Sequence, residues 1–258
     1  MSAPAIIVAA PQSGSGKTLV TLGLLLALHD QGLRVGSFKV GPDYIDPAFH
    51  ARASGRPCRN LDSWAMRLET LAGLVADAGR DADIVIGEGV MGLFDGAPDG
   101  TGSTADIAAL LGLPVILVVE TRRMAQSVAP LIEGVLRFRS DVAIDAIVLN
   151  ATGSDRHRQT LLKACDDRFS TPVLGCLPRL ADLELPARHL GLVQAAEHPD
   201  LEAFIDRAAG LVAEHLDLDR LIRLARRPTL DVFGQSLGLW PAIGQRIAVA
   251  RDAAFAVT

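Results

Sequence analysis

Short apolar runs alternate along this chain with longer stretches in which apolar residues recur at helical spacing. The apolar runs are hydrophobic enough to be strands covered on both faces, and they span residues 4–10, 33–40, 83–88, 114–120, 143–150 and 171–178. Helical spacing is found between them, at residues 17–30, 69–78, 104–111, 125–137, 155–166 and 201–215. This order predicts an α/β fold with a mostly parallel, doubly wound sheet and helices on both of its faces.

The pattern changes towards the C-terminus. Residues 218–228 have the spacing of an amphipathic helix with a basic face, which we expect to dock onto the domain. The composition shifts over residues 226–245, which we interpret as a linker or an outer flap, and residues 246–258 have the pattern of a new strand and turn. We therefore expect a main domain over residues 1–225, with its ligands at the carboxyl edge of the parallel strands.

Composition narrows the classes of function. The 258 residues are 49% hydrophobic and 21% charged, which is enough to bury a full core. A formal net charge of −5 argues against a nucleic-acid partner, because such domains usually carry a basic excess. The apolar runs are too short to span a bilayer and the N-terminus lacks signal-peptide features, so we expect a cytoplasmic protein without a membrane partner. Cys58, Cys165 and Cys176 lack metal-binding spacing, and free thiols are expected.

The strongest local motif is APQSGSGKTLVTLGLLLAL, at residues 10–28. A strand, a glycine-containing loop, Gly-Lys-Thr and a helix are typical of a P-loop, whose backbone N–H groups surround phosphates. Lys17 would reach the β and γ phosphates, and the Thr18 hydroxyl would coordinate Mg²⁺. Pro11 stands where the usual pattern has its first glycine. The residues that we expect to bind nucleotide here are Gln12, Ser13, Gly14, Ser15, Gly16, Lys17 and Thr18.

A second group of candidates lies in DIVIGEGVMGLFDG, at residues 83–96. Glu88 ends the predicted strand, and an acid at the tip of an apolar strand beside a P-loop is typical of the Walker B carboxylate that holds Mg²⁺. Asp83 begins the same strand and belongs to the opposite edge, where solvation or capping is expected. Asp95 follows on a glycine-rich loop that could bend over the nucleotide, and its alternative is an ordinary turn aspartate.

The third group is KVGPDYIDP, at residues 39–47. Lys39 ends the second predicted strand, so it faces the same edge as the P-loop. The prolines stiffen the turn that follows and hold Asp43 and Asp46 in place. Coordination of Mg²⁺ by Asp46 and positioning of a reacting group by Asp43 are the functional interpretation. Capping of the next helix is the alternative for either aspartate.

Five stretches taken together resemble one known family. They are FKVGPDYIDPAFH, EGVMGLFDG, GSTADIAALLGLPVILVVE, LNATGSDRHRQTL and LPARHLGLVQAAE, and the resemblance runs from about residue 4 to residue 197. The chain is similar to the cobyrinic or hydrogenobyrinic acid a,c-diamide synthases of cobalamin biosynthesis. The resemblance implies a dethiobiotin-synthetase-like P-loop domain that uses ATP and Mg²⁺ to amidate the a and c acetate groups of a corrin. It also implies a C-terminal glutaminase domain that supplies ammonia, of which residues 246–258 resemble the first strand.

The resemblance and the residues together assign roles. Lys17, Lys39, Asp43, Asp46, Glu88 and Asp95 form the expected catalytic set, in which Thr18, Asp46 and Glu88 hold Mg²⁺ and Lys39 offsets charge between the γ-phosphate and the substrate carboxylate. The resemblance does not separate phosphorylation from ammonia steering for Asp43 and Asp95. Asn150 matches the family position that recognises the adenine edge, with a strand-end cap as its alternative. Tyr44, Arg52 and Arg188 are candidates for binding the substrate, since arginine suits carboxylates.

Two other classes stay open from the sequence. A P-loop ATPase switch of the partitioning or septum-positioning type would share the fold, although Gln12 stands where such proteins carry a signature lysine. A related synthetase acting on another carboxylate or tetrapyrrole is the second alternative. The sequence does not distinguish a cobalt-free from a cobalt-bearing corrin, ATP from other triphosphates, glutaminase-derived from free ammonia, or a monomer from a homodimer.

Overall fold

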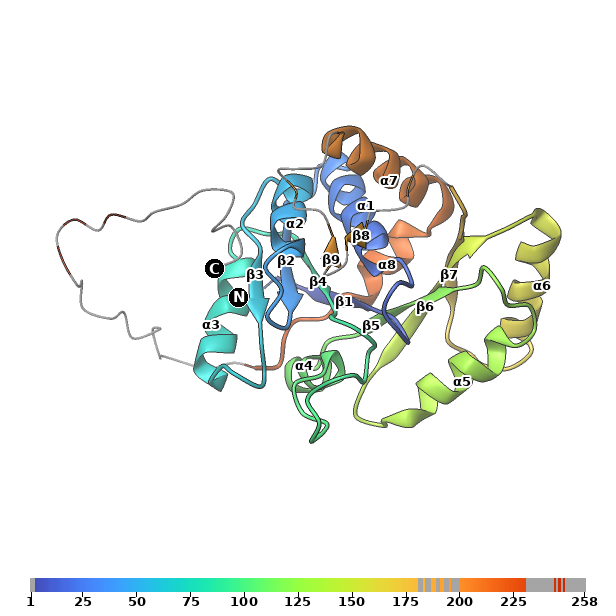
Figure 1. Cartoon of the computed structure of the whole chain (residues 1–258), viewed down its shortest axis with the longest axis horizontal. Coiled ribbons are helices and arrows are strands. Elements are labelled where there is room, and N and C mark those ends of the chain that lie inside the picture. The colour runs from blue at the N-terminus through green and yellow to red at the C-terminus, as the bar shows by residue number, and fades with distance from the viewer. Residues whose placement is uncertain are drawn as a thin grey trace.

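A computed structural model describes residues 3–180, 183, 187–188, 191–192, 195, 200–230, 244, 246 and 248. Seven strands form one sheet in the order β3-β2-β4-β1-β5-β6-β7, and every pairing in it is parallel (Figure 1). The strands are β1 Ala5–Ala9, β2 Val35–Val40, β3 Arg59–Leu61, β4 Ile84–Glu88, β5 Val115–Glu120, β6 Ile144–Thr152 and β7 Val173–Pro178. A separate antiparallel pair joins β8, Ala187–Arg188, to β9, Gly191–Leu192.

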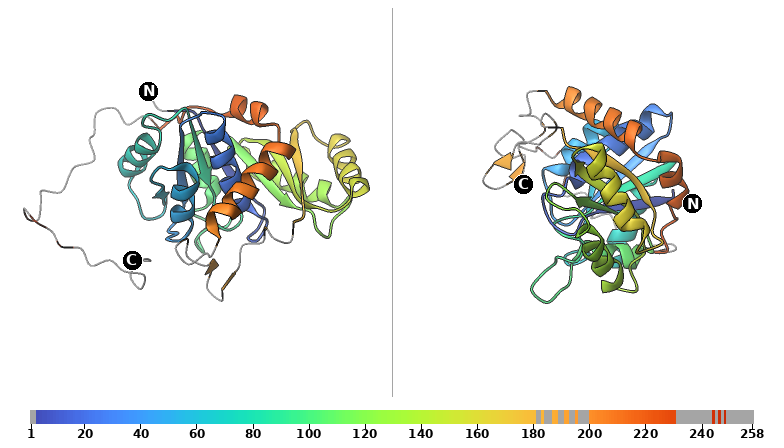
Figure 2. Two further views of the ribbon diagram at one scale, coloured as in Figure 1. Left: turned by 90° about the horizontal axis from the view of Figure 1, so that it is seen from above. Right: turned by 90° about the vertical axis from the view of Figure 1, so that its right-hand side faces the viewer.

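Helices cover both faces of the sheet (Figures 1 and 2). The helices are α1 Lys17–Asp30, α2 Asp46–Ser54, α3 Leu68–Ala78, α4 Thr104–Leu111, α5 Val128–Phe138, α6 Asp155–Asp166, α7 Leu201–His215 and α8 Leu218–Leu224. One buried cluster joins α1, α2, α7 and α8 to the sheet, and a second joins α3, α4, α5 and α6 to the opposite face. The molecule is therefore a three-layer α/β/α domain.

The central strand β1 shows why both layers are needed. Its five residues are all buried, with Ile6 and Val8 in the first cluster and Ile7 and Ala9 in the second. Successive side chains of a strand point to opposite faces, so a continuous apolar run is stable only when both faces are covered. The predicted doubly wound parallel fold is confirmed, and the six strands predicted between residues 4 and 178 and the six helices predicted between residues 17 and 215 are present with bounds that differ by at most a few residues. The strand and turn predicted over residues 246–258 lie, apart from residues 246 and 248, outside the described residues.

Several elements depart from the sequence expectations. Helix α2 and the short strands β3, β8 and β9 were not among the predicted elements. The predicted helix over 218–228 ends at Leu224, because the next residues turn to pair with the sheet: Arg226 exchanges backbone hydrogen bonds with Ala5 of β1. The first residues of the predicted linker, 226–230, thus contact the domain, whereas residues 231–243 lie outside the described residues.

Strand register brings the chemistry-bearing side chains to one edge. Lys39 in β2 lies directly beside Glu88 in β4, and Glu120 in β5 lies beside Asn150 in β6. Because the strands are parallel, these positions share the carboxyl edge with the loop that links β1 to α1. Cys58, Cys165 and Cys176 are free thiols, as predicted. Among the described residues, no helix has the length and hydropathy that a membrane span requires.

Candidate functional site

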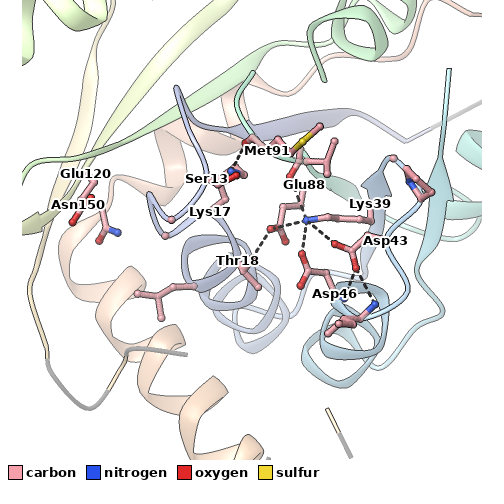
Figure 3. A pocket seen from close by; sticks show the side chains of 18 of the residues that line it. Ser13, Lys17, Thr18, Lys39, Asp43, Asp46, Glu88, Met91, Glu120 and Asn150 are labelled. Atoms are coloured by element: carbon pink, nitrogen blue, oxygen red, sulfur yellow. Dashed lines mark hydrogen bonds and ion pairs between the residues drawn. The ribbon is translucent and has the colours of Figure 1, made fainter. Parts of the chain in front are cut away.

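A cleft of about 1260 Å³ follows the carboxyl edge of the sheet. Its lining includes the P-loop, the turn after β2, the tip of β4 with the loop that follows, and the ends of β6 and β7 (Figure 3). This is the edge at which parallel α/β sheets bind their ligands. A cavity of this size exceeds the roughly 300–1,000 Å³ typical of small-molecule sites, so there is room for a second ligand beside a nucleotide.

The P-loop adopts backbone conformations that depend on glycine. Gly14 and Gly16 have φ values of 78° and 88°, in the left-handed region that glycine occupies without strain. A side chain at Gly16 would also collide with Asn150, since a Cβ there would lie 2.1 Å from its Nδ2 atom. That atom donates a hydrogen bond to the Ser15 carbonyl oxygen (2.9 Å), and the Ser15 hydroxyl donates to the carbonyl of Gln12 (3.0 Å). The loop is therefore closed on itself and tied to β6.

Lys17 lies at the start of α1 and points into the cleft beside this loop. Its ammonium donates to the backbone carbonyl of Met91, in the loop after β4, and lies 3.5 Å from the carbonyl oxygen of Gln12. Met91 has a φ of 47°, which is unusual for a residue with a side chain. Burial lowers the pKa of Lys17, with Glu88 acting in the opposite direction. The contact joins the two loops of the predicted site across the cleft.

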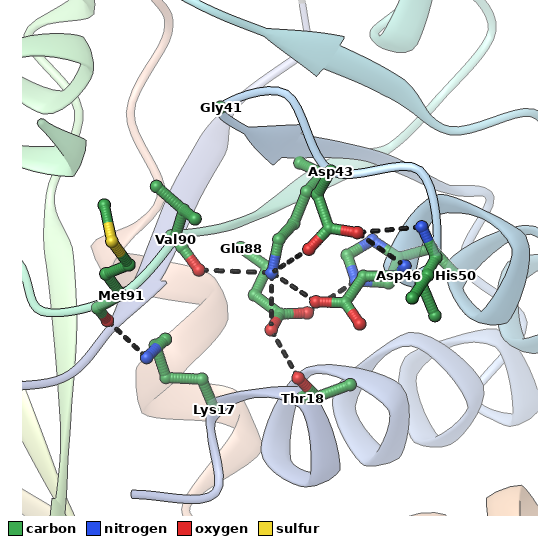
Figure 4. A network of polar contacts seen from close by, with 12 residues as sticks. Lys17, Thr18, Gly41, Asp43, Asp46, His50, Glu88, Val90 and Met91 are labelled. Atoms are coloured by element: carbon green, nitrogen blue, oxygen red, sulfur yellow. Dashed lines mark hydrogen bonds and ion pairs between the residues drawn. The ribbon is translucent and has the colours of Figure 1, made fainter. Parts of the chain in front are cut away.

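Lys39 lies at the centre of a buried cluster of acids (Figure 4). Its ammonium contacts the carboxylates of Asp46 and Glu88, the latter at 3.0 Å, and lies 3.8 Å from Asp43. Burial alone would lower the pKa of Lys39, but the three carboxylates outweigh burial and raise it. Lys39 therefore stays charged, and one cation is shared among three acids.

Asp46 and Glu88 respond to this environment in opposite directions. Burial, reinforced by the Glu88 charge, raises the pKa of Asp46 to about 6. Burial also acts to raise the pKa of Glu88, but Lys39 and hydrogen bonds from His50 and Thr18 outweigh it and lower that pKa. Glu88 is consequently the fixed negative charge of the cluster, whereas the ionised form of Asp46 is disfavoured.

Both carboxylate oxygens of Glu88 have donors. Thr18 Oγ1 donates to Oε1 (2.7 Å), which also accepts from Lys39, and His50 Nε2 lies 2.6 Å from Oε2. The sequence analysis did not single out His50. Asp46 and His50 lie four residues apart in α2 and share a face of that helix, but this spacing is informative only once α2 is known to be helical.

The other predicted acids make contacts within their own turns. Asp43 accepts hydrogen bonds from the backbone N–H groups of Ile45 (2.8 Å) and Asp46 (3.0 Å), so it caps the start of α2 while it faces Lys39. The Asp95 carboxylate accepts from the Gly92 N–H (2.8 Å), as a turn aspartate does. Asp95 is exposed and does not line the cleft. The structure brings Asp43 to the site and leaves Asp95 at its margin.

The predicted substrate-binding residues are distributed unevenly. Tyr44 lines the cleft with 59% of its surface exposed. Arg52 does not line it, because its side chain pairs with Glu202 of α7, so the geometry gives no support to Arg52 as a substrate ligand. The side chain of Arg188 lies outside the described residues. Trp64, which the sequence analysis passed over, lines the cleft and is 69% exposed.

The donor set can be compared with what a divalent cation requires. Thr18, Asp46 and Glu88 all line the cleft and present oxygen atoms, which Mg²⁺ prefers. Within the described residues there is no cluster of three His, Cys, Asp or Glu side chains that could hold a metal ion by themselves. Mg²⁺ usually keeps several waters and binds through one or two carboxylates together with substrate phosphates, so this oxygen set fits a cation that arrives with a nucleotide.

Comparisons with known proteins agree with the geometry. Residues 6–193 match the sequence profile described as "CobQ/CobB/MinD/ParA nucleotide binding domain". Over 251 residues, covering 97% of this chain and 58% of the relative, the chain is 53% identical to hydrogenobyrinate a,c-diamide synthase of Rhizobium meliloti (strain 1021). It is 47% identical to the protein of that name from Agrobacterium fabrum (strain C58 / ATCC 33970), over 99% of this chain and 58% of that relative.

The chain thus spans a little over half the length of these curated relatives. Among solved structures, the chloroplast FtsY of Physcomitrella patens matches with a TM-score of 0.50 at 13% identity, covering 81% of this chain and 66% of that one. At this identity the match concerns the fold alone.

Proposed function

From the premise that this chain belongs to the CobQ/CobB/MinD/ParA nucleotide-binding family, we propose that it activates the a and c acetate carboxylates of a corrin with ATP, so that ammonia can convert them to amides. The similarity to hydrogenobyrinate a,c-diamide synthases over nearly the whole chain supports this substrate. Ammonia would come from a glutaminase partner or from free ammonium.

The nucleotide would bind across the P-loop. Residues of the loop and of the start of α1 line the cleft, where their backbone N–H groups would stabilise a triphosphate. Lys17 would exchange the Met91 carbonyl for the β and γ phosphates, which is a small movement for a long side chain. Asn150, at the other side of the loop, would keep the Ser15 peptide oriented and could reach the base.

The carboxyl group of the substrate needs activation because a carboxylate is a poor acyl donor. Attack of a substrate carboxylate oxygen on the γ-phosphorus would break the bond to the ADP leaving oxygen and give an acyl phosphate. Ammonia would then attack the acyl carbon and release inorganic phosphate, with a proton lost from nitrogen. Mg²⁺, when bound with the nucleotide, supplies neutralisation of charge that develops on the transferring phosphoryl group.

The residues of this chain would act mainly by placing charge. Thr18, Asp46 and Glu88 would hold the cation, and Lys39 would stand between the γ-phosphate and the incoming carboxylate. Two anions repel each other, so a fixed cation at their meeting point stabilises the transition state more than the separated ground state. Asp43, beside Lys39, would keep its ammonium directed to this point.

One observation carries the proposal. Lys39, Asp46 and Glu88 come from three elements, are almost completely buried, and still converge on the same cleft as the P-loop. Replacing a buried ion pair by apolar residues is often neutral or stabilising, so such a cluster at a ligand edge is better explained by chemistry than by stability.

The test is isotopic. The chain is supplied with ATP, Mg²⁺, ammonium and hydrogenobyrinic acid whose carboxyl groups carry ¹⁸O, and released phosphate is examined by mass spectrometry. Label in the phosphate is expected, because the acyl phosphate transfers one carboxyl oxygen to phosphorus. ATP hydrolysis without label, stimulated by DNA or lipid instead of the corrin, would contradict the proposal and support an ATPase switch.

A further inference from the structure

We propose that His50 is a positioning residue for the cation site: it fixes the Glu88 carboxylate and its separation from Asp46, without touching nucleotide, cation or substrate. The inference rests on the proposed function, because it concerns the carboxylates assigned to Mg²⁺ there. His50 belongs to α2, an element that the sequence analysis did not predict.

The contact between His50 and Glu88 is shielded from solvent. The side chains of His50 and Glu88 are both fully buried, and Nε2 lies 2.6 Å from Oε2 (Figure 4). An ionised carboxylate only accepts hydrogen bonds, so the hydrogen between these atoms is carried by Nε2. On the far side of the ring, Nδ1 lies 3.4 Å from Cys58 Sγ. The imidazole is therefore held at both nitrogens and has a single orientation.

The two carboxylate oxygens of Glu88 have different partners. Oε2 faces His50, whereas Oε1 meets Thr18 and Lys39, both of which line the cleft. His50 itself does not line the cleft. Because His50 holds Oε2, the carboxylate cannot rotate freely about the Cγ–Cδ bond of Glu88. Oε1 therefore remains the oxygen that faces a ligand in the cleft.

The same contact links helix α2 to strand β4. Asp46 begins α2 and His50 lies one turn later in the same helix, while Glu88 ends β4. The bond from His50 to Glu88 thus joins the helix that carries one proposed metal carboxylate to the strand that carries the other. Without it, Lys39 alone would hold these two acids of like charge beside each other. Hydrogen bonds to metal ligands orient them and typically change metal affinity by about 10–100-fold.

A purely structural histidine would show the same burial, so the test must measure the cation site. His50→Gln and His50→Asn form a matched pair of neutral amides. The Gln amide nitrogen takes the approximate place of Nε2 and can reach Glu88, whereas the shorter Asn places its amide near Nδ1 and cannot. Cys58→Ala is the control that removes the other partner of the ring.

For each variant, affinity for a nonhydrolysable ATP analogue is measured by calorimetry with saturating Mg²⁺ and again with EDTA, and folding is checked by circular dichroism. With Mg²⁺, His50→Asn should bind about 10–100-fold more weakly than the parent. His50→Gln and Cys58→Ala should stay within about threefold of the parent, the latter because Glu88 keeps its donor. With EDTA, the affinities should agree within about twofold, because His50 contacts no phosphate-binding residue.

Two results would overturn this role of His50. One is a folded His50→Asn variant with the parent's Mg²⁺-dependent affinity, and the other is an equal loss with Mg²⁺ and with EDTA. If the Asn variant does not fold, the Gln variant decides: a loss of tenfold or more with Mg²⁺ despite a retained donor also contradicts the proposal. A parent chain that binds no nucleotide with or without Mg²⁺ would instead contradict the proposed function.

Discussion

Strands β2 and β4 have an ion pair at each end, and the two pairs differ in almost everything but charge. At the amino end, Arg34 and Asp83 are 2.8 Å apart with side chains 60% and 38% exposed. At the carboxyl end, Lys39 and Glu88 are 3.0 Å apart with side chains 3% and 0% exposed. A solvated ion pair and a desolvated one can therefore be compared at the two ends of the same pair of strands.

Desolvation changes what each pair does. Water screens the Arg34–Asp83 pair, and an exposed pair contributes little to stability. Burial removes the hydration of the Lys39–Glu88 pair, and the attraction between the two charges offsets this cost only when further hydrogen-bonding partners are present. Those partners are present: Asp46 and Asp43 face Lys39, and Thr18 and His50 face Glu88. The pair at the amino end is an ordinary surface contact. The pair at the carboxyl end belongs to a buried network of charges whose members come from several elements.

The largest effect is expected from removing the shared cation. Lys39→Met leaves three acids without their ammonium, and breaking a buried pair costs about 3–5 kcal/mol. Urea denaturation with EDTA should show a loss of that size, and added Mg²⁺ should recover part of it by replacing the missing charge. Arg34→Met, at the other end of β2, is the matched control and should change stability far less. Equal losses in the two variants would show that burial does not separate the pairs.

Asp46→Asn should separate stability from chemistry. Burial and Glu88 raise the pKa of Asp46 to about 6, so its charge is held at a cost in the folded chain. The neutral variant should unfold at the same denaturant concentration as the parent or a higher one. Its ATP-dependent phosphorylation of the corrin should fall by about 100-fold or more, as when a charge-stabilising group is removed.

Asp155→Asn is the matched control, since Asp155 begins α6 as Asp46 begins α2 but is exposed. This control should retain the parent's turnover. Near-normal turnover of Asp46→Asn would remove Asp46 from the site.

The candidate residues at the ends of strands could be predicted better than the residues that pack against them from α2. Lys17, Lys39 and Glu88 could be assigned to one edge because each follows an apolar run, and parallel strands end together. The glycines of the P-loop could also be recognised from the motif, and the structure shows Gly14 and Gly16 in left-handed conformations. These predictions depend only on local periodicity and on the direction of the strands.

The remainder depends on packing that no local pattern encodes. Among the apolar residues of helix α2 only Phe49 and Ala53 are buried, so its apolar face was too narrow to recognise from the sequence. His50 becomes a partner of Glu88 only when α2 packs beside β4. Arg52 was a candidate from its residue type alone, and in the structure its exposed side chain pairs with Glu202 of α7.

A smaller effect is expected at β6, which also carries polar residues towards both ends. Asn150 donates to the Ser15 carbonyl (2.9 Å) at the carboxyl end, whereas Asp145 pairs with Arg226 near the amino end. Asn150→Ala should weaken binding of a nonhydrolysable ATP analogue by about 1 kcal/mol, or roughly fivefold, because one hydrogen bond to the P-loop is lost. Asp145→Ala should leave that affinity unchanged. A calorimetric titration in which both variants match the parent would exclude Asn150 from nucleotide binding.

The smallest effect is expected from Asp83→Asn at the amino end of β4. Hydrogen bonds from Arg34 lower the pKa of Asp83 to about 2, below its ordinary value near 4. A depressed pKa means that the ionised carboxylate stabilises the fold above about pH 4, and that this contribution disappears as pH falls towards 2. The melting temperature of the parent should therefore exceed that of the variant slightly at pH 6, and the two should converge below pH 3.

Salt provides a second measurement of the same pair. Raising the ionic strength should reduce the small difference between parent and Asp83→Asn at pH 6, because water and ions reach both side chains. The loss of stability caused by Lys39→Met should persist at high ionic strength, because the charges around Lys39 are buried away from water and ions. A difference at Asp83 that ignores pH and salt would mean that the hydrogen bond from the Arg34 backbone N–H (2.8 Å), not the charge, stabilises this end of the strands. The contrast between the two ends would then be one of hydrogen bonding and not of desolvated charge.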